Sequence, residues 1–260
     1  MEPHTAKRSL YSLLAYEKSH GIKNGIYDKV QIDFAYNTTH MEGSLLTLEQ
    51  TRQVYETNAV ADAPARVNDI IETVNHFRCF RYIIGTVDTI LSENYIKKLH
   101  FMLKNGTLDS DREDAVIGDY KKQNNYAGKI EATKAEDTAA EMAKLISEYN
   151  ALPKVSIYEM IDFHSAFEKI HPFYDGNGRV GRLIMFKECL CRGIVPFFID
   201  DMYNAFYNRG LLEWQTGGEK GYLLDTCLTM QDNMKKILDT FNIEYDKTEY
   251  TSKEILKKHN

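Results

Sequence analysis

Apolar side chains recur along most of this chain every three to four residues, which is the spacing of one face of an α-helix. The segment 156–169 shows the pattern most clearly. Ser156 and Glu159 form a capping-box pair there, and apolar residues follow at helical spacing as far as Phe167. The pattern predicts an all-α chain. Further helices are predicted from Thr47 onward, over residues 67–91, 92–103 and 138–149, and from Gly178 onward.

Residues 118–134 are the exception to the helical pattern. Tyr120, Tyr126 and Ile130 alternate weakly with polar residues around a turn-forming stretch at residues 124–128. This segment predicts a small β-hairpin.

The last part of the chain, residues 236–260, is highly charged and has few large apolar residues besides Phe241 and Ile255. We expect a charged, solvated helical tail there. The preceding residues 1–235 are expected to form one domain, because a chain of 260 residues suffices for one compact domain with attached helices.

The overall charge of −6 offers no general attraction to nucleic acid or to an anionic membrane. No apolar run approaches the roughly 18 residues of a membrane span, and the apolar stretch 10–16 lacks the layout of a signal peptide. We therefore expect a cytoplasmic protein with neither nucleic acid nor membrane as a partner.

The cysteines do not form a pattern typical of a disulfide framework or a zinc site, because no CxxC pair is present. Reduced and mostly buried thiols are expected at Cys79, Cys189, Cys191 and Cys227.

Chemistry concentrates in the segment 171–182. His171 follows a predicted helix, Gly176 and Gly178 allow positive φ and close approach of a ligand, and a new helix follows. Free backbone N–H groups at a helix N-terminus form an anion site, and Asn177 tolerates the left-handed conformation of such a loop.

Charged side chains complete this segment. Arg179 and Arg182 are three residues apart and oppose the dipole of the helix they begin, an arrangement that a bound polyphosphate would favour. Asp175 offers a carboxylate to Mg²⁺, and a largely neutral His171 can accept a hydroxyl proton. A zinc site of His164, His171 and Asp175 lacks a fourth ligand at suitable spacing.

Residues 167–182 closely resemble the HxFx(D/E)GNGRxxR signature of the Fic domain family, and chance agreement is on the order of 10⁻⁹. Members of that family typically use ATP to adenylylate Ser, Thr or Tyr hydroxyls of target proteins. The resemblance implies a Fic-type helical bundle with a small β-hairpin flap. It also implies a protein adenylyltransferase with ATP and Mg²⁺ as cofactors and a target protein, or the chain itself, as partner. The oligomeric state stays open.

The family's roles transfer by position. His171 resembles the general base and Asp175 the Mg²⁺ ligand. Gly176, Asn177 and Gly178 resemble the nest that holds the α- and β-phosphates.

The remaining family positions concern the phosphates and the nucleoside. Arg179 and Arg182 resemble the pair that orients the phosphates, and Tyr207 lies in a region similar to the adenosine side. From the residues alone, a core position is favoured for Tyr207, as it is for Trp214. His100 also looks family-like, and residues 118–134 lie where the family has its target-clamping flap.

A second motif lies within residues 33–44. The run from Thr38 to Gly43 resembles the family's inhibitory motif (S/T)xxxE(G/N), and the spacing of Thr38 and Glu42 predicts one face of a short helix with Gly43 at its end. The resemblance implies that Glu42 pairs with Arg182 and so prevents productive binding of ATP.

Two alternatives remain beside the transferase. One is a hydrolase that removes AMP from a modified protein and uses Glu42 to activate water. The other is a nucleotide-sensing module without catalysis. Base selection lies outside the motif, so UTP or GTP also stays open.

Overall fold

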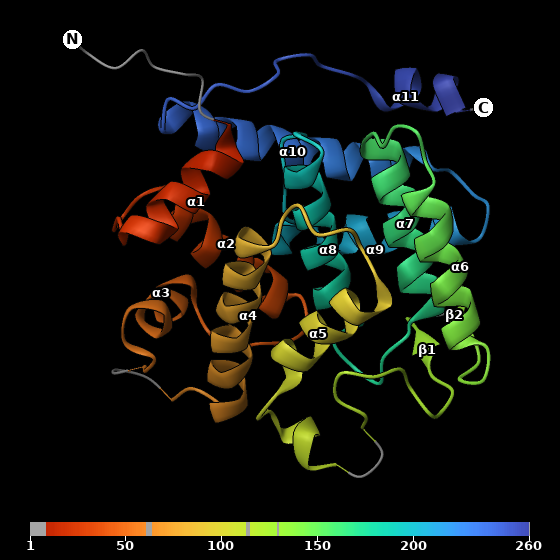
Figure 1. Cartoon of the computed structure of the whole chain (residues 1–260), viewed down its shortest axis with the longest axis horizontal. Coiled ribbons are helices and arrows are strands. Elements are labelled where there is room, and N and C mark those ends of the chain that lie inside the picture. Colours follow the sequence, from red (N-terminus) through yellow and green to blue (C-terminus); the bar gives the residue numbers. More distant parts are fainter. Residues whose placement is uncertain (1–8, 61–63, 113–114, 129, 260) are drawn as a thin grey trace.

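The computed structural model describes residues 9–60, 64–112, 115–128 and 130–259. These residues are mainly helical, and a two-stranded antiparallel hairpin supplies their sheet, which confirms the predicted all-α class with a small hairpin (Figure 1). The elements are α1 (Leu10–His20), α2 (Ile26–His40), α3 (Leu48–Thr57), α4 (Val67–Gly85), α5 (Glu93–Lys104), η1 (Leu108–Asp111), β1 (Tyr126–Ala127), β2 (Ile130–Glu131), α6 (Thr138–Asn150), α7 (Ile157–Ile170), α8 (Asn177–Cys191), η2 (Asp201–Tyr203), α9 (Asn204–Gln215), α10 (Gly221–Thr240) and α11 (Ser252–His259).

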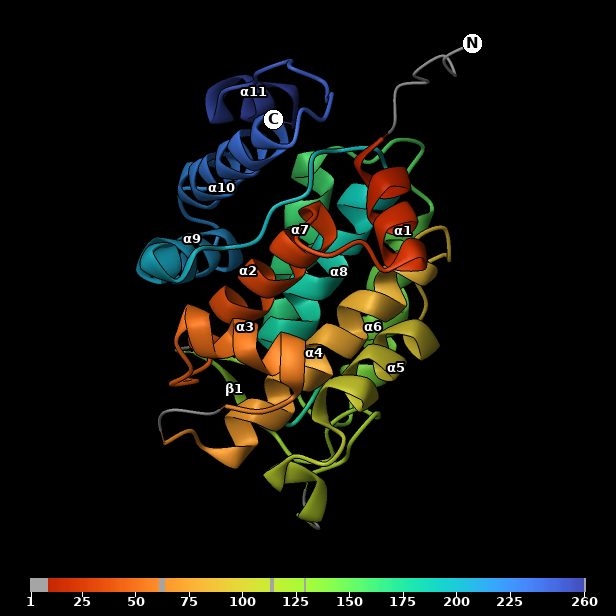
Figure 2. The same cartoon turned by 90° about the vertical axis from the view of Figure 1, so that its left-hand side faces the viewer.

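Helix α8 is the centre of the molecule. It contacts α2, α4, α5 and α7 (Figures 1 and 2), and every side chain from Val180 to Leu190 is buried. A helix that is buried on all sides has little freedom to move. The segment that precedes it therefore lies on a rigid support.

Local hydrogen bonds explain where several helices begin. Thr47 and Ser156 form the predicted capping boxes with Gln50 and Glu159, and Ser92 caps α5. The predicted helix 67–91 ends earlier, at Gly85, because the following Thr86 leaves the helical conformation.

The hairpin turn falls later than the sequence pattern predicted. The strands pair Tyr126 with Glu131 and Ala127 with Ile130. The turn therefore begins after Ala127, whereas the sequence pattern placed it at residues 124–128. Gly128 has the positive φ of 60° that this turn requires. Asn125 instead donates a hydrogen bond to the carbonyl of Phe173, 2.9 Å away, which ties the hairpin to the segment 171–182.

The C-terminal segment is more tightly packed than predicted. Helix α10 continues past residue 235 to Thr240, and α11 lies along it (Figure 2). Leu238, Ile243 and Ile255 are buried, so the expectation of a solvated tail is wrong at these positions, whose apolar side chains join the core. The division into residues 1–235 and 236–260 stays a prediction.

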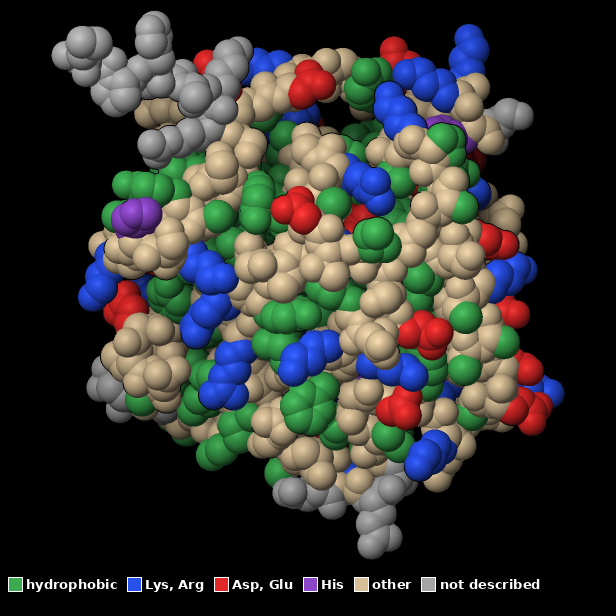
Figure 3. All heavy atoms as spheres, in the orientation of Figure 1, with side chains coloured by type: hydrophobic (Ala, Val, Ile, Leu, Met, Phe, Trp, Pro, Cys, Tyr) green, Lys and Arg blue, Asp and Glu red, His purple; other side chains and the backbone are tan. Residues whose placement is uncertain are grey.

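The remaining expectations concern thiols and charge. All four cysteines are free, and three of them are buried, as predicted. None of the helices in the described part of the chain is long and apolar enough to cross a membrane. Basic and acidic side chains are interspersed on the face drawn in Figure 3.

Candidate active site

The loop between α7 and α8 is held by its own side chains. His171 ends α7 in the left-handed conformation, with φ 52°, and Gly176 begins α8 with φ 80°. The side chain of Asn177 accepts a hydrogen bond from the backbone N–H of Phe173 and donates one to its carbonyl, at 2.8 and 2.9 Å. The side chain of Asn177 thus holds the loop in shape. Its backbone N–H lies at the N-terminus of α8, where an anion could accept a hydrogen bond from it.

His171 is set up as a proton acceptor. Its Nδ1 lies 3.3 Å from the carbonyl oxygen of Glu168. A carbonyl only accepts, so the hydrogen of the ring belongs on Nδ1 and the lone pair on Nε2. Burial lowers the pKa of His171, which favours the neutral ring at neutral pH.

A cavity of about 660 Å³ opens beside this loop, within the size range of small-molecule sites. The hairpin borders it on one side and α9 on another. It brings together five of the predicted site residues, namely Glu42, His171, Gly178, Arg182 and Tyr207.

Arg182 is tied to the predicted inhibitory segment. Its Nε donates to Thr38 Oγ1 at 2.6 Å, and its Nη2 lies 2.5 Å from Glu42 Oε1. Gly178 makes this approach possible, because a Cβ at that position would lie 2.6 Å from Glu42 Oε1. The expected pairing of Glu42 with Arg182 is therefore present.

The shape of the inhibitory segment differs from the predicted short helix. Thr38 belongs to the last turn of the 15-residue helix α2, and Glu42 lies in the turn that follows. The reason is that Gly43 adopts φ 89° and the backbone N–H of Glu42 bonds to the carbonyl of Thr39. Asp69 of α4 accepts a hydrogen bond from the backbone N–H of Leu45 and so anchors the end of this turn.

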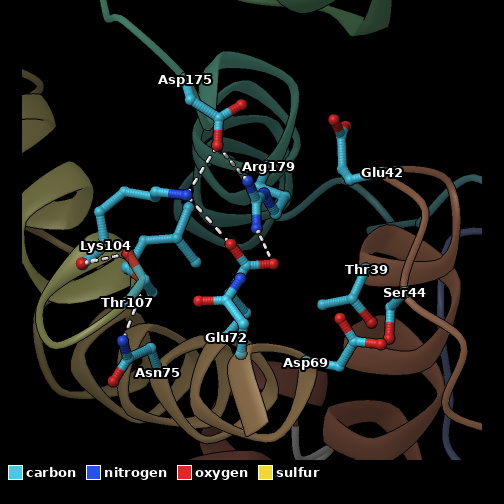
Figure 4. A network of polar contacts seen from close by, with 12 residues as sticks. Thr39, Glu42, Ser44, Asp69, Glu72, Asn75, Lys104, Thr107, Asp175 and Arg179 are labelled. Carbon is cyan, nitrogen blue, oxygen red and sulfur yellow. Dashed lines mark hydrogen bonds and ion pairs between the residues drawn. The ribbon is translucent and has the colours of Figure 1, made fainter. Parts of the chain in front are cut away.

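Arg179 and Asp175 belong to a separate charged network (Figure 4). Neither residue lines the cavity. The Nη2 of Arg179 lies 2.9 Å from Asp175 Oδ2, and its Nη1 lies 2.6 Å from Glu72 Oε2. Lys104 Nζ adds a contact of 2.6 Å to the same Asp175 oxygen. The two arginines, predicted to share one face and one ligand, thus have different partners.

These contacts determine the state of Asp175. Burial alone would raise the pKa of Asp175, but the charges of Arg179 and Lys104 outweigh it and hold that pKa far below its usual range. The carboxylate is ionised, its side chain is 44% exposed, and one oxygen is turned away from Lys104 and Arg179 (Figure 4). An exposed, ionised oxygen suits Mg²⁺, which is usually held by one or two carboxylates together with substrate phosphates.

His100 supports the loop from α5. Its Nδ1 accepts the backbone N–H of Gly118 at 2.9 Å, and its Nε2 lies 3.1 Å from the carbonyl of Asp175. The ring stacks on Phe173 at 3.9 Å between centroids. Burial lowers the pKa of His100 to about 3, so the ring is neutral and serves as a structural link between α5, residue 118 and the loop.

Comparison with known families agrees with this geometry. Residues 90–189 match the model of the Fic/DOC family, and this range contains the complete loop together with α5, the hairpin and α7. The chain carries a domain of the Fic/DOC family.

Curated relatives of this Fic chain carry the name "Protein adenylyltransferase Fic". Those from Drosophila mojavensis and Drosophila willistoni are 28% and 26% identical over 183 and 182 residues, which is 66% of this chain in each case. The relative from Drosophila melanogaster is 25% identical over 204 residues, or 75% of this chain. The chain spans only 34% to 40% of the length of these relatives.

Solved structures share the fold of this Fic chain. A Fic domain containing signaling protein from Bacteroides thetaiotaomicron superimposes with a TM-score of 0.70 at 20% identity, over 88% of this chain and 94% of that one. Fic-1 from C. elegans gives 0.70 at 16% identity, over 89% and 71%.

Tyr207 of the Fic chain is buried, yet it lines the cavity. Its Oη lies 2.6 Å from His164 Nε2, and its ring faces the guanidinium of Arg182 at 6.0 Å. The core position favoured from the residues alone is present, and so is the contact with the site. Trp214 is also buried and donates a hydrogen bond to Asp162.

The sequence reasoning missed Glu168 as a site residue. Its carboxyl lines the cavity, its side chain is largely buried, and its Oε1 has no hydrogen-bond partner among the described residues. Burial raises the pKa of Glu168 to about 8, which Arg182 opposes and Glu42 reinforces. The sequence did contain a signal for this role: Glu168 is a charged residue on the apolar face of its helix and lies three positions before His171.

A second cavity of about 810 Å³ is larger, but the loop 171–182 contributes nothing to its lining. Residues of α1, α2 and α3 line most of it. Size alone therefore does not single out a candidate active site, and the loop with its histidine and arginines marks the smaller cavity as the candidate.

Proposed function

We propose that this protein is an adenylyltransferase that moves AMP from ATP–Mg²⁺ onto a hydroxyl of a target protein. The observation that carries the proposal is the cavity in which His171 and Arg182 lie beside the N-terminus of α8. The names of the curated relatives support the same reaction class.

His171 would act on the attacking hydroxyl. Its Nε2 accepts the proton while the hydroxyl oxygen bonds to the α-phosphorus of ATP. The bond between the α-phosphorus and the bridging oxygen breaks, and pyrophosphate leaves with the electron pair. The backbone N–H groups of Gly176, Asn177 and Gly178 would face the α- and β-phosphates, so catalysis consists mainly of positioning and charge stabilisation.

Asp175 is the residue proposed to hold Mg²⁺, through the oxygen that Lys104 and Arg179 leave exposed. Bound there with the nucleotide, Mg²⁺ would neutralise phosphate charge. Arg182 is proposed to hold the terminal phosphates, and Tyr207 to border the adenosine.

Glu42 is proposed to keep the resting protein inactive. Its carboxylate lies 2.5 Å from Arg182 Nη2 and so occupies the guanidinium that the terminal phosphates require. The Nε of the same guanidinium donates a hydrogen bond to Thr38 Oγ1. A bias of about 3 kcal/mol toward this closed state suppresses transfer by roughly two orders of magnitude.

The target is proposed to pair with the hairpin. Ala127, Gly128 and Ile130 line the cavity, so a segment added along this hairpin would place its side chain near His171. Main-chain pairing would select an extended segment of a target protein or of the chain itself, and the Ser, Thr or Tyr hydroxyl would be read at His171 and not by the pairing.

The test uses ATP labelled either at the α- or at the γ-phosphate, incubated with Mg²⁺ and a cell lysate. Relative to lysate without this protein, in which endogenous kinases already transfer the γ-label, Glu42→Gly should add label from α-ATP and none from γ-ATP. The double variant Glu42→Gly/His171→Ala should transfer none while retaining nucleotide binding. Transfer of the γ-label above that background would contradict the reaction, and undiminished transfer by the double variant would contradict the role of His171.

One observation favours a second function, the removal of AMP from a modified protein. Glu42 and His171 line the same cavity, so a carboxylate able to activate water is present beside the proposed acid–base residue. Glu42→Gly separates the two reactions, because it should raise transfer and abolish removal. A nucleotide sensor would bind ATP equally in both proteins and turn it over in neither.

A further inference from the structure

Lys104 lies in the last turn of α5 and has almost no access to solvent, with 1% of its side chain exposed. Its Nζ lies 2.6 Å from Asp175 Oδ2, 2.6 Å from Asp109 Oδ2 and 3.0 Å from Glu72 Oε1. An ammonium group has three hydrogens to donate, so each of them has one carboxylate acceptor. All three donors of the ammonium are thus taken up by protein carboxylates. Lys104 does not line the cavity.

The three carboxylates around Lys104 have the spacing of a cation site. Glu72, Asp109 and Asp175 each place one oxygen within 4.8 Å of the others, close enough to ligate a single ion. We call these three residues the carboxylate cage. Oxygen ligands of this kind suit hard divalent cations. In this protein the ammonium of Lys104 fills the space where such a cation would lie.

The same contacts orient Asp175. Its Oδ2 receives both Lys104 and Arg179, whereas the other oxygen points away from the cage (Figure 4). We propose that Lys104 is a positioning residue for Asp175: its ammonium occupies the carboxylate cage, keeps divalent ions out of it, and leaves only the outer oxygen of Asp175 for a metal–nucleotide. This inference rests on the proposed function, in which Asp175 carries the metal of the bound nucleotide.

A purely stabilising network has different consequences. Removing Lys104 would then reduce stability without creating a metal site. Lys187 offers a matched control, because its side chain is also 1% exposed and its ammonium lies 2.7 Å from one carboxylate, Glu188 Oε1. A variant at Lys187 loses a buried ammonium but leaves no cage of three carboxylates behind.

The experiment titrates the 260-residue protein with Mn²⁺ in the absence of nucleotide and follows free Mn²⁺ by electron paramagnetic resonance. Lys104→Met should bind one Mn²⁺ more than the wild type, with a dissociation constant at least about tenfold lower than that of any Mn²⁺ site in the wild type. Lys187→Met should bind Mn²⁺ as the wild type does. Adding Asp109→Asn to Lys104→Met should remove the gain. Equal Mn²⁺ binding by Lys104→Met and the wild type would overturn the proposal.

Two further measurements cover a Lys104→Met protein that fails to fold. Lys104→Gln keeps a hydrogen-bond donor in the cage and should show the same gain in Mn²⁺ binding. In wild-type protein labelled with ¹⁵N-lysine, the protected ammonium signal of Lys104 should persist when ATP and Mg²⁺ are added, and its loss would mean that the metal displaces Lys104. Because the Mn²⁺ titration involves neither nucleotide nor turnover, it stays informative if the transferase proposal fails.

Discussion

The two arginines of the motif stand three residues apart at the start of α8, yet their surroundings differ. Arg179 pairs with Glu72 of the long helix α4 and with Asp175 of the rigid loop. Arg182 pairs with Glu42, which lies in a turn after α2 and has a side chain that is 29% exposed. Both arginines are buried, but Arg179 binds two carboxylates, whereas Arg182 binds one carboxylate, which is partly exposed to solvent. We therefore propose that Arg179 and its partners serve stability, and that Arg182 and its partners serve control.

The largest effect is expected from Arg179→Met. It leaves two carboxylates, those of Glu72 and Asp175, without a buried guanidinium, and the loss of one partner from such a network costs about 3–5 kcal/mol. Arg182→Met should lower the free energy of unfolding by less, because the partly exposed side chain of Glu42 can turn to solvent. The free energy of unfolding in urea measures both, and equal losses would remove the distinction between the two arginines.

Glu42→Gly should raise AMP transfer by about two orders of magnitude, because it frees Arg182 for the nucleotide. Glu42→Gln keeps the side chain but loses its charge, so its transfer rate should lie between those of the wild type and the glycine variant. Rates with α-labelled ATP measure the series. Indistinguishable rates for all three proteins would show that Glu42 exerts no control.

Glu168, which lines the cavity beside Arg182, should make the stability of the protein depend on pH. Burial raises the pKa of Glu168 from 4.5 to about 8, so between these values the folded protein holds a proton that the unfolded chain has released. The free energy of unfolding should therefore fall as pH rises from 4.5 to 8, by at most about 1.4 kcal/mol per pH unit from this group. Glu168→Gln lacks this contribution.

The measurement is urea unfolding of the wild type and Glu168→Gln at several pH values from 5 to 8. The stability of the wild type relative to the variant should decline steadily as pH rises. Parallel pH curves would show that Glu168 does not retain its proton in the fold.

The smallest effect is expected from Thr38→Val, which removes the hydrogen bond to Arg182 Nε and preserves the shape of the side chain. A hydrogen bond to a charged group contributes roughly 1.5 kcal/mol at the low end of measured values. Transfer should rise about tenfold, clearly less than in Glu42→Gly. A rise in Thr38→Val but none in Thr38→Val/Glu42→Gly relative to Glu42→Gly would place both residues in one closed state, whereas independent rises would contradict it.

The sequence predicted the parts of the molecule that depend on neighbouring residues. The starts of α3 and α7 follow from hydrogen bonds within one turn, at Thr47 and Ser156. The loop could be anticipated because its histidine, glycines and arginines are contiguous. The pairing of Glu42 with Arg182, 140 residues apart, came only from the family resemblance.

The charged network could not be anticipated from the sequence, because its members meet only in the folded chain. Lys104 and Asp175 are 71 residues apart, and neither is marked by its neighbours as the partner of the other. The turn of the hairpin was misplaced for a similar reason. Asn125 resembles a turn residue, but its side chain bonds to Phe173 of the distant loop.

The proposed function requires that the cavity beside His171 delivers AMP to protein once Glu42 releases Arg182. Mass spectrometry of intact and digested protein after incubation of the Glu42→Gly variant with ATP, Mg²⁺ and lysate tests it most directly. We expect an adduct with the mass of AMP on a defined Ser, Thr or Tyr, and no adduct when His171 is also replaced by Ala. The absence of any adduct from a folded Glu42→Gly protein that binds ATP would contradict it.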